Sequence, residues 1–221
     1  MIVTFIAHSA FLVEWDKFYT LFDYTWEPDY TAPLPEIGPE KPLLVFASHS
    51  HEDHFDPKIF SLLERYPSAR FFVSRDTRLT ERRRKWLNIS DEAFARTTVL
   101  RPDSILLTEA AGEELSVRAI KSTDIGNAYL LRAEGKMVYH GGDLNWWHWE
   151  SEGQSYCSDM AAHYRGAVAK LAAAVRDEAA DNGLAPEIFA AMAPLDPRLG
   201  ESAEGLGVDY LMKSVCVRHL F

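Results

Sequence analysis

One segment constrains both the fold and the chemistry of this chain: an apolar run that ends in a dense cluster of metal-binding side chains. Leu43–Ala47 is a continuous apolar run of strand length, which predicts a strand covered on both faces. Directly after it come His49, His51, Asp53 and His54, within six residues. Imidazole nitrogens and carboxylate oxygens together suit zinc, manganese or iron. The segment therefore predicts a buried strand that leads into a metal-binding loop; the alternative is a polar surface loop that happens to be rich in histidine.

The spacing inside this cluster indicates how the ligands are shared. Side chains two residues apart on a strand point to the same side, as His49 and His51 do here. The loop that follows turns Asp53 and His54 toward a neighbouring point. We expect two metal sites close together, because two metals can share one water, lower its pKa and clamp the attacking and leaving oxygens.

A second segment offers a further carboxylate. Asp143 follows two glycines, Gly141 and Gly142, directly after an apolar run at 137–139 that predicts another strand. The glycines let the backbone approach closely, and one carboxylate can bridge two cations. The alternative is a plain Gly-Gly-Asp turn.

Length and charge limit the class of protein. With 221 residues and 47% hydrophobic content, the chain is expected to form a single domain over residues 1–221. Its net charge of −10 disfavours a nucleic-acid partner, because binding phosphates requires a basic face. One basic run lies in residues 75–85. It is either a phosphate or nucleic-acid patch or, as we favour, a solvated helix face.

The chain's ends and cysteines predict its compartment. Cys157 and Cys216 form no Cys-x-x-Cys pair, and we expect two buried free thiols in a reducing environment. Residues 1–8 lack a basic start and a long apolar stretch, so no signal peptide is expected, and no run is long enough for a membrane span. The predicted location is the cytoplasm.

The remaining pattern predicts strands interrupted by a few helices. Helical spacing and a cap signal at Asn182-Gly183 indicate one long Ala-rich helix at 160–180. Other helices are expected at 58–66, 76–86 and 208–213, and a proline-rich loop at 28–42. This order favours a two-layer sheet core with helices outside, an α/β fold. Strands are expected at 2–7, 10–15, 21–22, 43–47, 70–74, 99–100, 104–107, 115–121, 129–133, 137–139, 188–193 and 215–221.

These residues resemble the metallo-β-lactamase superfamily, whose hallmarks are His-x-His-x-Asp-His after a strand and a later Gly-Asp. The resemblance extends over essentially the whole chain and is closest to the ascorbate-lactonase-like branch. In that branch His-Ser, Phe-Asp and Gly-Asp-Leu-Asn with tryptophans recur, and the matching residues here are His8-Ser9, Phe22-Asp23 and 142–147. The resemblance implies a four-layer αβ/βα sandwich.

The resemblance also implies roles for the ligands. His49 and His51 would hold the first metal, Asp53 and His54 the second, and Asp143 would bridge them. The metals are expected to be two divalent ions, with zinc first and manganese or iron as alternatives.

Two positions depart from the family's pattern. The first metal usually has a third His before the Gly-Asp, but no His lies between 54 and 140. Asp124 lies at the matching place, as an oxygen ligand or as a turn residue before Gly126. The family's final His follows the last strand; here the sequence ends in that strand, and His219 matches a strand position. We therefore expect the fold to lack its extreme C-terminal part, or the second site to lack one ligand.

Four further residues are expected around the site. His8 lines the metal cleft or is a core histidine, and Asp23 positions the metal-binding loop without binding metal itself. Trp146 and Trp147 form a wall of the substrate pocket or serve in packing.

Together these features predict a hydrolase with a binuclear metal site. Water activated there would attack a small-molecule ester, lactone or phosphoester, with Asp53 and Asp143 as the catalytic carboxylates. The alternatives are a metal-dependent nuclease or phosphodiesterase, and a metal-binding module impaired in catalysis. A membrane partner is not expected, and a homodimer is plausible from the tryptophan cluster and the apolar end of the chain.

Overall fold

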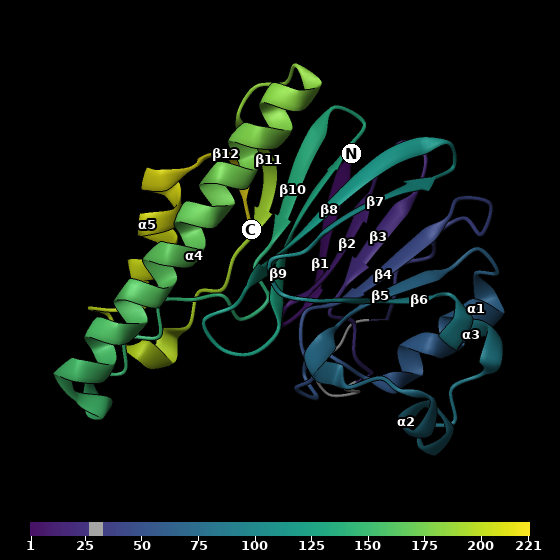
Figure 1. Ribbon diagram of the computed structural model, residues 1–221, viewed down its shortest axis with the longest axis horizontal. Coiled ribbons are helices and arrows are strands. Elements are labelled where there is room, and N and C mark those ends of the chain that lie inside the picture. Colours follow the sequence, from purple (N-terminus) through teal and green to yellow (C-terminus); the bar gives the residue numbers. More distant parts are fainter. Residues whose placement is uncertain (27–32) are drawn as a thin grey trace. The chain divides into compact units, whose positions relative to one another are not determined.

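The computed structural model describes residues 1–26 and 33–221. These residues form two mixed six-stranded sheets with helices against them, which confirms the predicted α/β class (Figure 1). The chain divides into two compact units. The first contains Met1–Arg101 and Leu107–Leu115, and the second contains Pro102–Leu106 and Ser116–Phe221. The expectation of a single domain over 1–221 stays a prediction.

The first sheet places the ends of its parallel strands at one edge. Its strands follow the sequence, and β1 to β3 pair antiparallel while β3 to β6 pair parallel. Because parallel strands have their carboxyl ends on the same side, the loops after β3, β4 and β5 lie together. The six strands are β1 (Ile2–Ala7), β2 (Ala10–Glu14), β3 (Tyr19–Phe22), β4 (Leu43–Ala47), β5 (Arg70–Ser74) and β6 (Thr97–Leu100).

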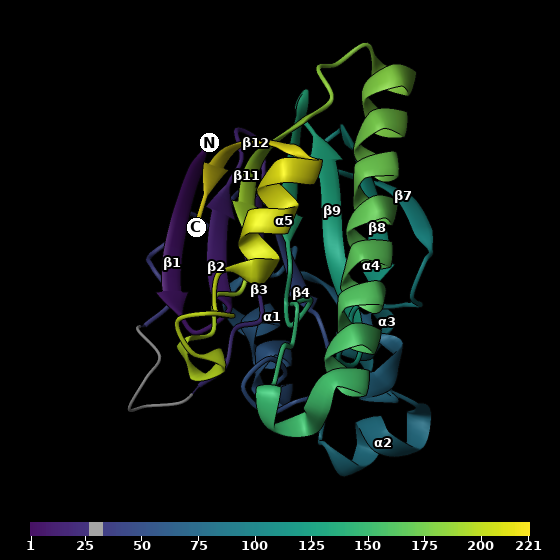
Figure 2. The ribbon, with the colours of Figure 1, turned by 90° about the vertical axis from the view of Figure 1, so that its left-hand side faces the viewer.

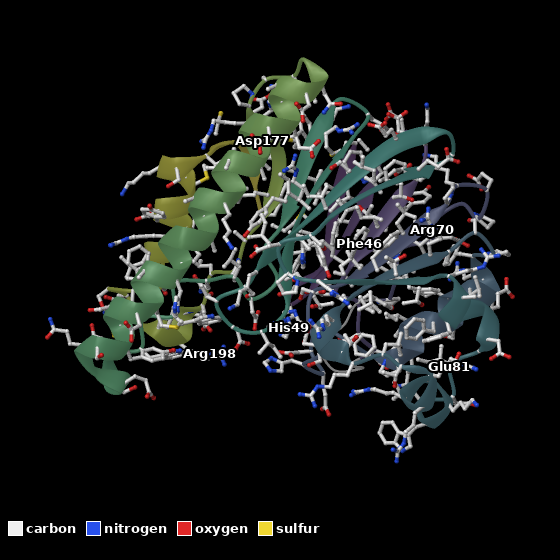
Figure 3. All side chains as sticks on the ribbon, in the orientation of Figure 1. Phe46, His49, Arg70, Glu81, Asp177 and Arg198 are labelled. Carbon is white, nitrogen blue, oxygen red and sulfur yellow. The ribbon has the colours of Figure 1, made fainter. Side chains whose placement is uncertain are left out.

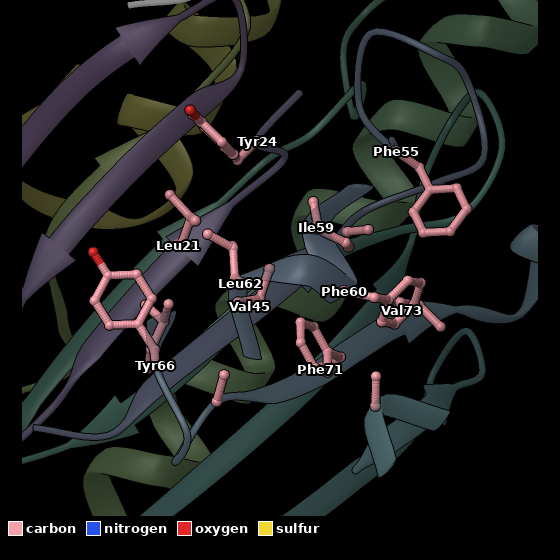
Figure 4. Close-up of a cluster of buried hydrophobic side chains, with 14 of the residues drawn as sticks. Leu21, Tyr24, Val45, Phe55, Ile59, Phe60, Leu62, Tyr66, Phe71 and Val73 are labelled. Carbon is pink, nitrogen blue, oxygen red and sulfur yellow. The ribbon is translucent and has the colours of Figure 1, made fainter. Parts of the chain in front are cut away.

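Strand β4 has the double-sided burial that its apolar sequence predicts. All five of its residues are at most 1% exposed. One face packs into a core in which Val45 joins Leu21 and Phe71 from the neighbouring strands (Figure 4). Ile59 and Phe60, from the segment after the histidine cluster, cover this core. The loop that carries the histidine cluster is therefore held between a buried strand and a helical segment that is anchored by two buried residues.

The short helices of the first unit differ from the sequence prediction. The helix expected at 58–66 is a 3-10 helix, η1 (Pro57–Ser61), followed by one turn of α-helix, α1 (Leu62–Arg65). The helix expected at 76–86 is divided, because Arg78 adopts a left-handed conformation with φ 50° that ends η2 (Arg75–Thr77). Thr80 then caps α2 (Glu81–Trp86). A further helix, α3 (Asp91–Ala95), was not predicted and is capped by Ser90.

The predicted proline-rich loop at 28–42 is described only in part. Residues 28–32 lie outside the described residues, and residues 33–42 contain no helix or strand.

The second sheet contains the second carboxylate-bearing segment. Its order is β12-β11-β10-β9-β8-β7, with β10 to β12 parallel and β8 to β10 antiparallel. Asp143 follows β10, and Asp124 follows β8, in the loop that leads to β9. The strands are β7 (Ile105–Ala110), β8 (Glu113–Lys121), β9 (Asn127–Ala133), β10 (Lys136–His140), β11 (Glu187–Met192) and β12 (Cys216–Leu220).

Helices α4 (Gly153–Asn182) and α5 (Leu206–Ser214) pack against the second sheet (Figure 2). Leu171 and Val175 of α4 contact the cluster that contains Leu130 and Met137 of the strands. The helix begins earlier than predicted but ends where the sequence indicated, at Gly183 in a left-handed conformation. Two 3-10 turns, η3 (Glu150–Glu152) and η4 (Pro197–Leu199), complete the described elements of this unit.

Two charged strand residues fix α4 on the sheet. Glu178 accepts hydrogen bonds from Ser116 at 2.7 Å, Arg118 at 2.6 Å and Arg132 at 3.2 Å. Its side chain is only 6% exposed. A buried carboxylate with two guanidinium partners stabilises one register of the helix on the sheet, because other registers would leave a charge uncompensated.

The cysteines correct one prediction. Cys157 is buried, as expected, but Cys216 is exposed because it begins the edge strand β12. None of the described helices is both long enough and apolar enough to cross a lipid bilayer.

Candidate metal centre

The loop after β4 turns sharply, and this turn brings its histidines together. The backbone N–H groups of His54 and Phe55 both donate to the carbonyl oxygen of His51, at 3.0 and 2.8 Å. The N–H of Ser50 donates to Asp76 Oδ2 at 2.7 Å, which anchors the loop to the end of the neighbouring strand β5. His49, which Figure 3 labels, consequently lies close to His54. Their ring centroids are 4.0 Å apart.

His8, Asp53 and His54 form one group of possible ligands. Their ligand atoms all lie within 4.8 Å of one another. His8 Nε2 is 3.3 Å from both Asp53 Oδ2 and His54 Nε2, and the Asp53 oxygen is 4.0 Å from the same His54 nitrogen. His8 reaches this position from the turn between β1 and β2, where its φ is 48°. A non-glycine residue with positive φ is uncommon and is often found at functional sites.

His49 and His51 form a second pair. His49 Nε2 lies 3.0 Å from His51 Nδ1, so both imidazoles present a ring nitrogen to one point. His49 is fully buried and His51 is exposed. The structure thus brings together the ligands that the sequence assigned to the first metal within this unit, and it does the same for Asp53 and His54.

Asp23 is a buried carboxylate that is connected to both groups, to His54 directly and to His49 through Ser48. It also has a positive φ, 45°, and follows β3 at the edge where the metal-binding loop begins. Its Oδ1 accepts from the N–H of Ser48 at 2.7 Å. Its Oδ2 lies 2.6 Å from Ser48 Oγ and 2.8 Å from His54 Nδ1. These contacts hold the backbone of Ser48 and the imidazole of His54 in place. A role for Asp23 in positioning metal ligands stays a prediction.

The hydrogen-bond network around Asp23 lets us assign the histidine tautomers. A carboxylate only accepts, so His54 carries its proton on Nδ1 and the Ser48 hydroxyl donates to Asp23. Ser48 Oγ then accepts from His49 Nδ1 at 2.9 Å. Both imidazoles are left with a lone pair on Nε2, directed toward His8 and His51 respectively. Protein metal sites use this arrangement to orient histidine ligands.

Asp53 is held in its charged form. The hydrogen bond from His8 keeps the pKa of the Asp53 carboxyl well below its usual range, with a further contribution from His54 that burial partly offsets. A carboxylate that stays ionised can bind a cation near neutral pH.

The second unit brings two carboxylates together. Asp124 and Asp143 have oxygens within 4.8 Å of one another. Thr123 Oγ1 lies 2.7 Å from the Asn145 carbonyl oxygen and accepts from the Asn145 N–H at 3.1 Å, so the two loops are joined beside the aspartates. Such close carboxylates repel unless a proton or a cation lies between them.

The other predicted residues of this unit lie in different surroundings. Trp146 packs against Tyr164 and Tyr210, with ring centroids 5.9 and 5.8 Å away. Its contacts are those of the packing alternative. The indole N–H of Trp147 donates to the carbonyl oxygen of Asp143 at 3.2 Å. His219 lies in β12 beside Phe189, at the strand position that its sequence indicated.

Two residues of the site were not predicted. Ser48 connects Asp23 to His49, and Asp76 holds the N–H of Ser50. A polar residue directly after a strand parallel to β4 was the available signal for Asp76. Nothing in the sequence indicates which hydrogen bonds Ser48 makes.

The donor set of the first unit fits divalent metals. It offers imidazole nitrogens with their lone pairs directed to common points, and an ionised carboxylate beside them. This combination of nitrogen and oxygen ligands suits zinc, manganese and iron.

Comparison with known proteins adds a family match. Residues 2–155 match the family described as the β-lactamase superfamily domain. No curated protein matches the chain. Among solved structures, Igni18, a metallo hydrolase from Ignicoccus hospitalis, is 21% identical with a TM-score of 0.44, covering 63% of this chain and 59% of its own.

Two other solved structures cover more of this chain. A candidate metal-dependent hydrolase from Parabacteroides distasonis is 16% identical with a TM-score of 0.49, covering 98% of this chain and 91% of its own. CmlA, a diiron β-hydroxylase from Streptomyces venezuelae, is 12% identical with a TM-score of 0.47, covering 91% of this chain and 39% of its own. The family assignment rests on the sequence match alone.

Proposed function

Because the chain belongs to the metallo-β-lactamase superfamily, we propose that it is a metal-dependent hydrolase of a small-molecule ester, lactone or phosphoester. The observation that carries the proposal is the network in which Asp23 fixes the tautomers of His49 and His54. Histidines that serve only in packing do not need both of their Nε2 lone pairs directed at other ligand groups. Among these substrates we prefer those of the ascorbate-lactonase-like branch, which the sequence resembles most.

The proposed site holds two divalent ions, with zinc as our first choice. His49 and His51 would bind one ion, and Asp53 and His54 the other. Bound divalent metals lower the pKa of a water molecule and polarise the substrate oxygen that gains negative charge. Asp53, kept ionised by His8, would accept a hydrogen bond from that water and orient it.

We propose two further ligands from the order of the family's motifs. Asp143 would bridge the two ions, and Asp124 would replace the usual third His of the first metal. The support is the family's motif order and the proximity of the two carboxylate oxygens. An oxygen ligand at Asp124 would make the first site more tolerant of manganese or iron. Trp147, hydrogen-bonded to the backbone of Asp143, would line the substrate pocket.

Metal content and hydrolysis measured together test the proposal. Protein purified without added metal should contain about two metal atoms per chain by elemental mass spectrometry, since a binuclear site binds two ions. Asp143→Ala should lower this content and abolish hydrolysis of a panel of p-nitrophenyl esters, lactones and bis-p-nitrophenyl phosphate. Circular dichroism should show that the variant remains folded.

The control for this variant is Asp159→Ala, which removes an exposed carboxylate from α4. It should keep the metal content and rate of the wild-type chain. An unchanged rate in Asp143→Ala would exclude the bridging role. Full metal occupancy with no hydrolysis of any panel substrate would favour the metal-binding module instead of the enzyme.

A further inference from the structure

Residues 75–86, which we call the basic segment, carry charge that the proposed hydrolase site does not use. Among their charged side chains only two are acidic, and both are engaged: Asp76 holds the N–H of Ser50, and Glu81 pairs with Arg84 at 2.9 Å. The remaining cations are Arg75, Arg78, Arg82, Arg83 and Lys85.

These cations have no anionic partner among the residues of their unit that the structure describes. Within residues 1–26 and 33–221, the side chains of Arg75, Arg78, Arg82 and Lys85 make no hydrogen bond or ion pair, and all four are exposed. The Nε atom of Arg83 is buried and has no hydrogen-bond partner among the same residues. By contrast, Arg65, Arg84 and Arg96 of the same unit all pair with a carboxylate.

The segment ends in an exposed aromatic ring. Trp86 is 79% exposed, the largest value among the exposed large hydrophobic residues that the structure describes. It closes helix α2, which has no buried residue and which begins at Glu81 (Figure 3). Because α2 has no buried residue, the Trp86 indole does not contribute to the core. Its exposure to water costs free energy and stabilises no part of the fold.

We propose that the basic segment is a binding surface for single-stranded nucleic acid. Guanidinium groups recognise phosphate in a bidentate manner, and they outnumber the single lysine here. An exposed aromatic ring beside them is the platform on which unpaired bases stack. A lipid surface fits less well, because binding there requires a broad apolar face and α2 offers one large apolar side chain.

The surface is connected to the candidate metal centre through Asp76. That residue follows Arg75 and holds the backbone of Ser50, between His49 and His51. A single-stranded nucleic acid bound along the basic segment would therefore run beside the loop that carries His49 and His51, in the same unit. The net charge of −10 predicted the opposite, but the distribution of charge over the surface decides binding, and the number of phosphate contacts sets its salt dependence.

Fluorescence anisotropy tests this proposal independently of hydrolysis. The probes are fluorescein-labelled 15-nucleotide oligo(dT) and oligo(U), titrated with the full chain at 50 mM and 200 mM salt with EDTA present. We expect binding that weakens with salt, because released counterions drive it. Arg82→Glu with Lys85→Glu should weaken binding by at least tenfold and reduce the salt slope by about 1.4, at about 0.7 for each lost phosphate contact.

Trp86→Ala provides a second variant, expected to weaken binding by about fivefold to a hundredfold through lost stacking. The control is Arg176→Glu with Lys213→Glu, the same charge change at two exposed positions of α4 and α5. It should bind within twofold of the wild-type chain. Equal losses in the basic-segment and control variants, or no binding by the wild-type chain, would overturn the proposal. So would binding to vesicles with 30% phosphatidylserine but not to either oligonucleotide. Failure of the hydrolase assay would leave this result unaffected.

Discussion

At the scale of single residues, Asp23 is the position where a small change should have the largest effect on metal binding. Asp23→Asn keeps the shape of the side chain but replaces one acceptor oxygen with a donor. His54 and Ser48 then lose their common acceptor, and the imidazole tautomers are no longer fixed. We expect zinc affinity to fall by about tenfold to a hundredfold, measured by competition with a chromophoric chelator.

Asp56→Asn is the matched control for this variant. Asp56 is a carboxylate of the same loop, but it caps η1 by accepting from the N–H of Lys58 at 2.8 Å. Its replacement should leave zinc affinity within twofold of the wild-type value. Equal losses in the two variants would indicate a general loosening of the loop instead of a tautomer effect.

The sequence indicates the proposed ligands of the first unit and a positioning role for Asp23, but not the contacts through which Asp23 would act. The spacing of His49, His51, Asp53 and His54 follows from one strand and one turn, which are local features. The contacts of Asp23 with Ser48 and His54 join segments that are 25 and 31 residues apart. Such contacts depend on the order of strands in the sheet, and a single sequence does not specify this order.

At the scale of elements, the attachment of α4 to its sheet should depend on pH. Burial disfavours the charged form of Glu178, but hydrogen bonds from Arg118, Ser116 and Arg132 more than offset it, so the pKa of its carboxyl is lowered. A lowered pKa in the folded state stabilises the fold above the ordinary value of 4.5. This stabilisation is lost as the pH falls through the folded value.

We therefore expect Glu178→Gln to reduce the free energy of unfolding by about 3 kcal/mol at pH 7, because two guanidinium groups lose their counter-charge. Urea unfolding between pH 7 and pH 3 should show the difference from the wild-type chain shrinking below about pH 4.5. Asp177→Asn, at an adjacent and 64% exposed carboxylate, should change stability by less than about 0.5 kcal/mol. A difference for Glu178→Gln that stays constant with pH would contradict this account.

Elements with long, regular patterns were easier to predict than short ones. Strand β4 and helix α4 have many residues that favour the same structure, and both were predicted. The division of residues 75–86 depends on one left-handed residue, Arg78, which no periodicity indicates. The exposure of Cys216 depends on β12 lying at a sheet edge, which is a property of the whole sheet.

At the scale of the whole molecule, removal of metal should leave the fold intact but less stable. Each of the two units has its own buried core, and neither core contains a proposed ligand. Treatment with EDTA should therefore leave the far-ultraviolet circular dichroism spectrum unchanged. Free zinc at one hundred times its Kd should add about 2.7 kcal/mol to the free energy of unfolding for each bound ion, a rise in Tm of about 5–10 °C per ion. Unfolding on EDTA treatment would show instead that the metals are part of the fold.

The carboxylate of Asp23, which helps to hold the imidazoles of His49 and His54, also affects the entropy change of metal binding. A histidine with freely rotating side-chain torsions must give up that freedom when it binds an ion, and the loss subtracts from the affinity. His49 and His54 are already immobile, since both are buried and both are held through Ser48 or Asp23. The conformational entropy of these two side chains is therefore lost when the chain folds and not when a metal binds. A chain built this way should release its metals to a chelator and take them up again repeatedly, without passing through an unfolded state.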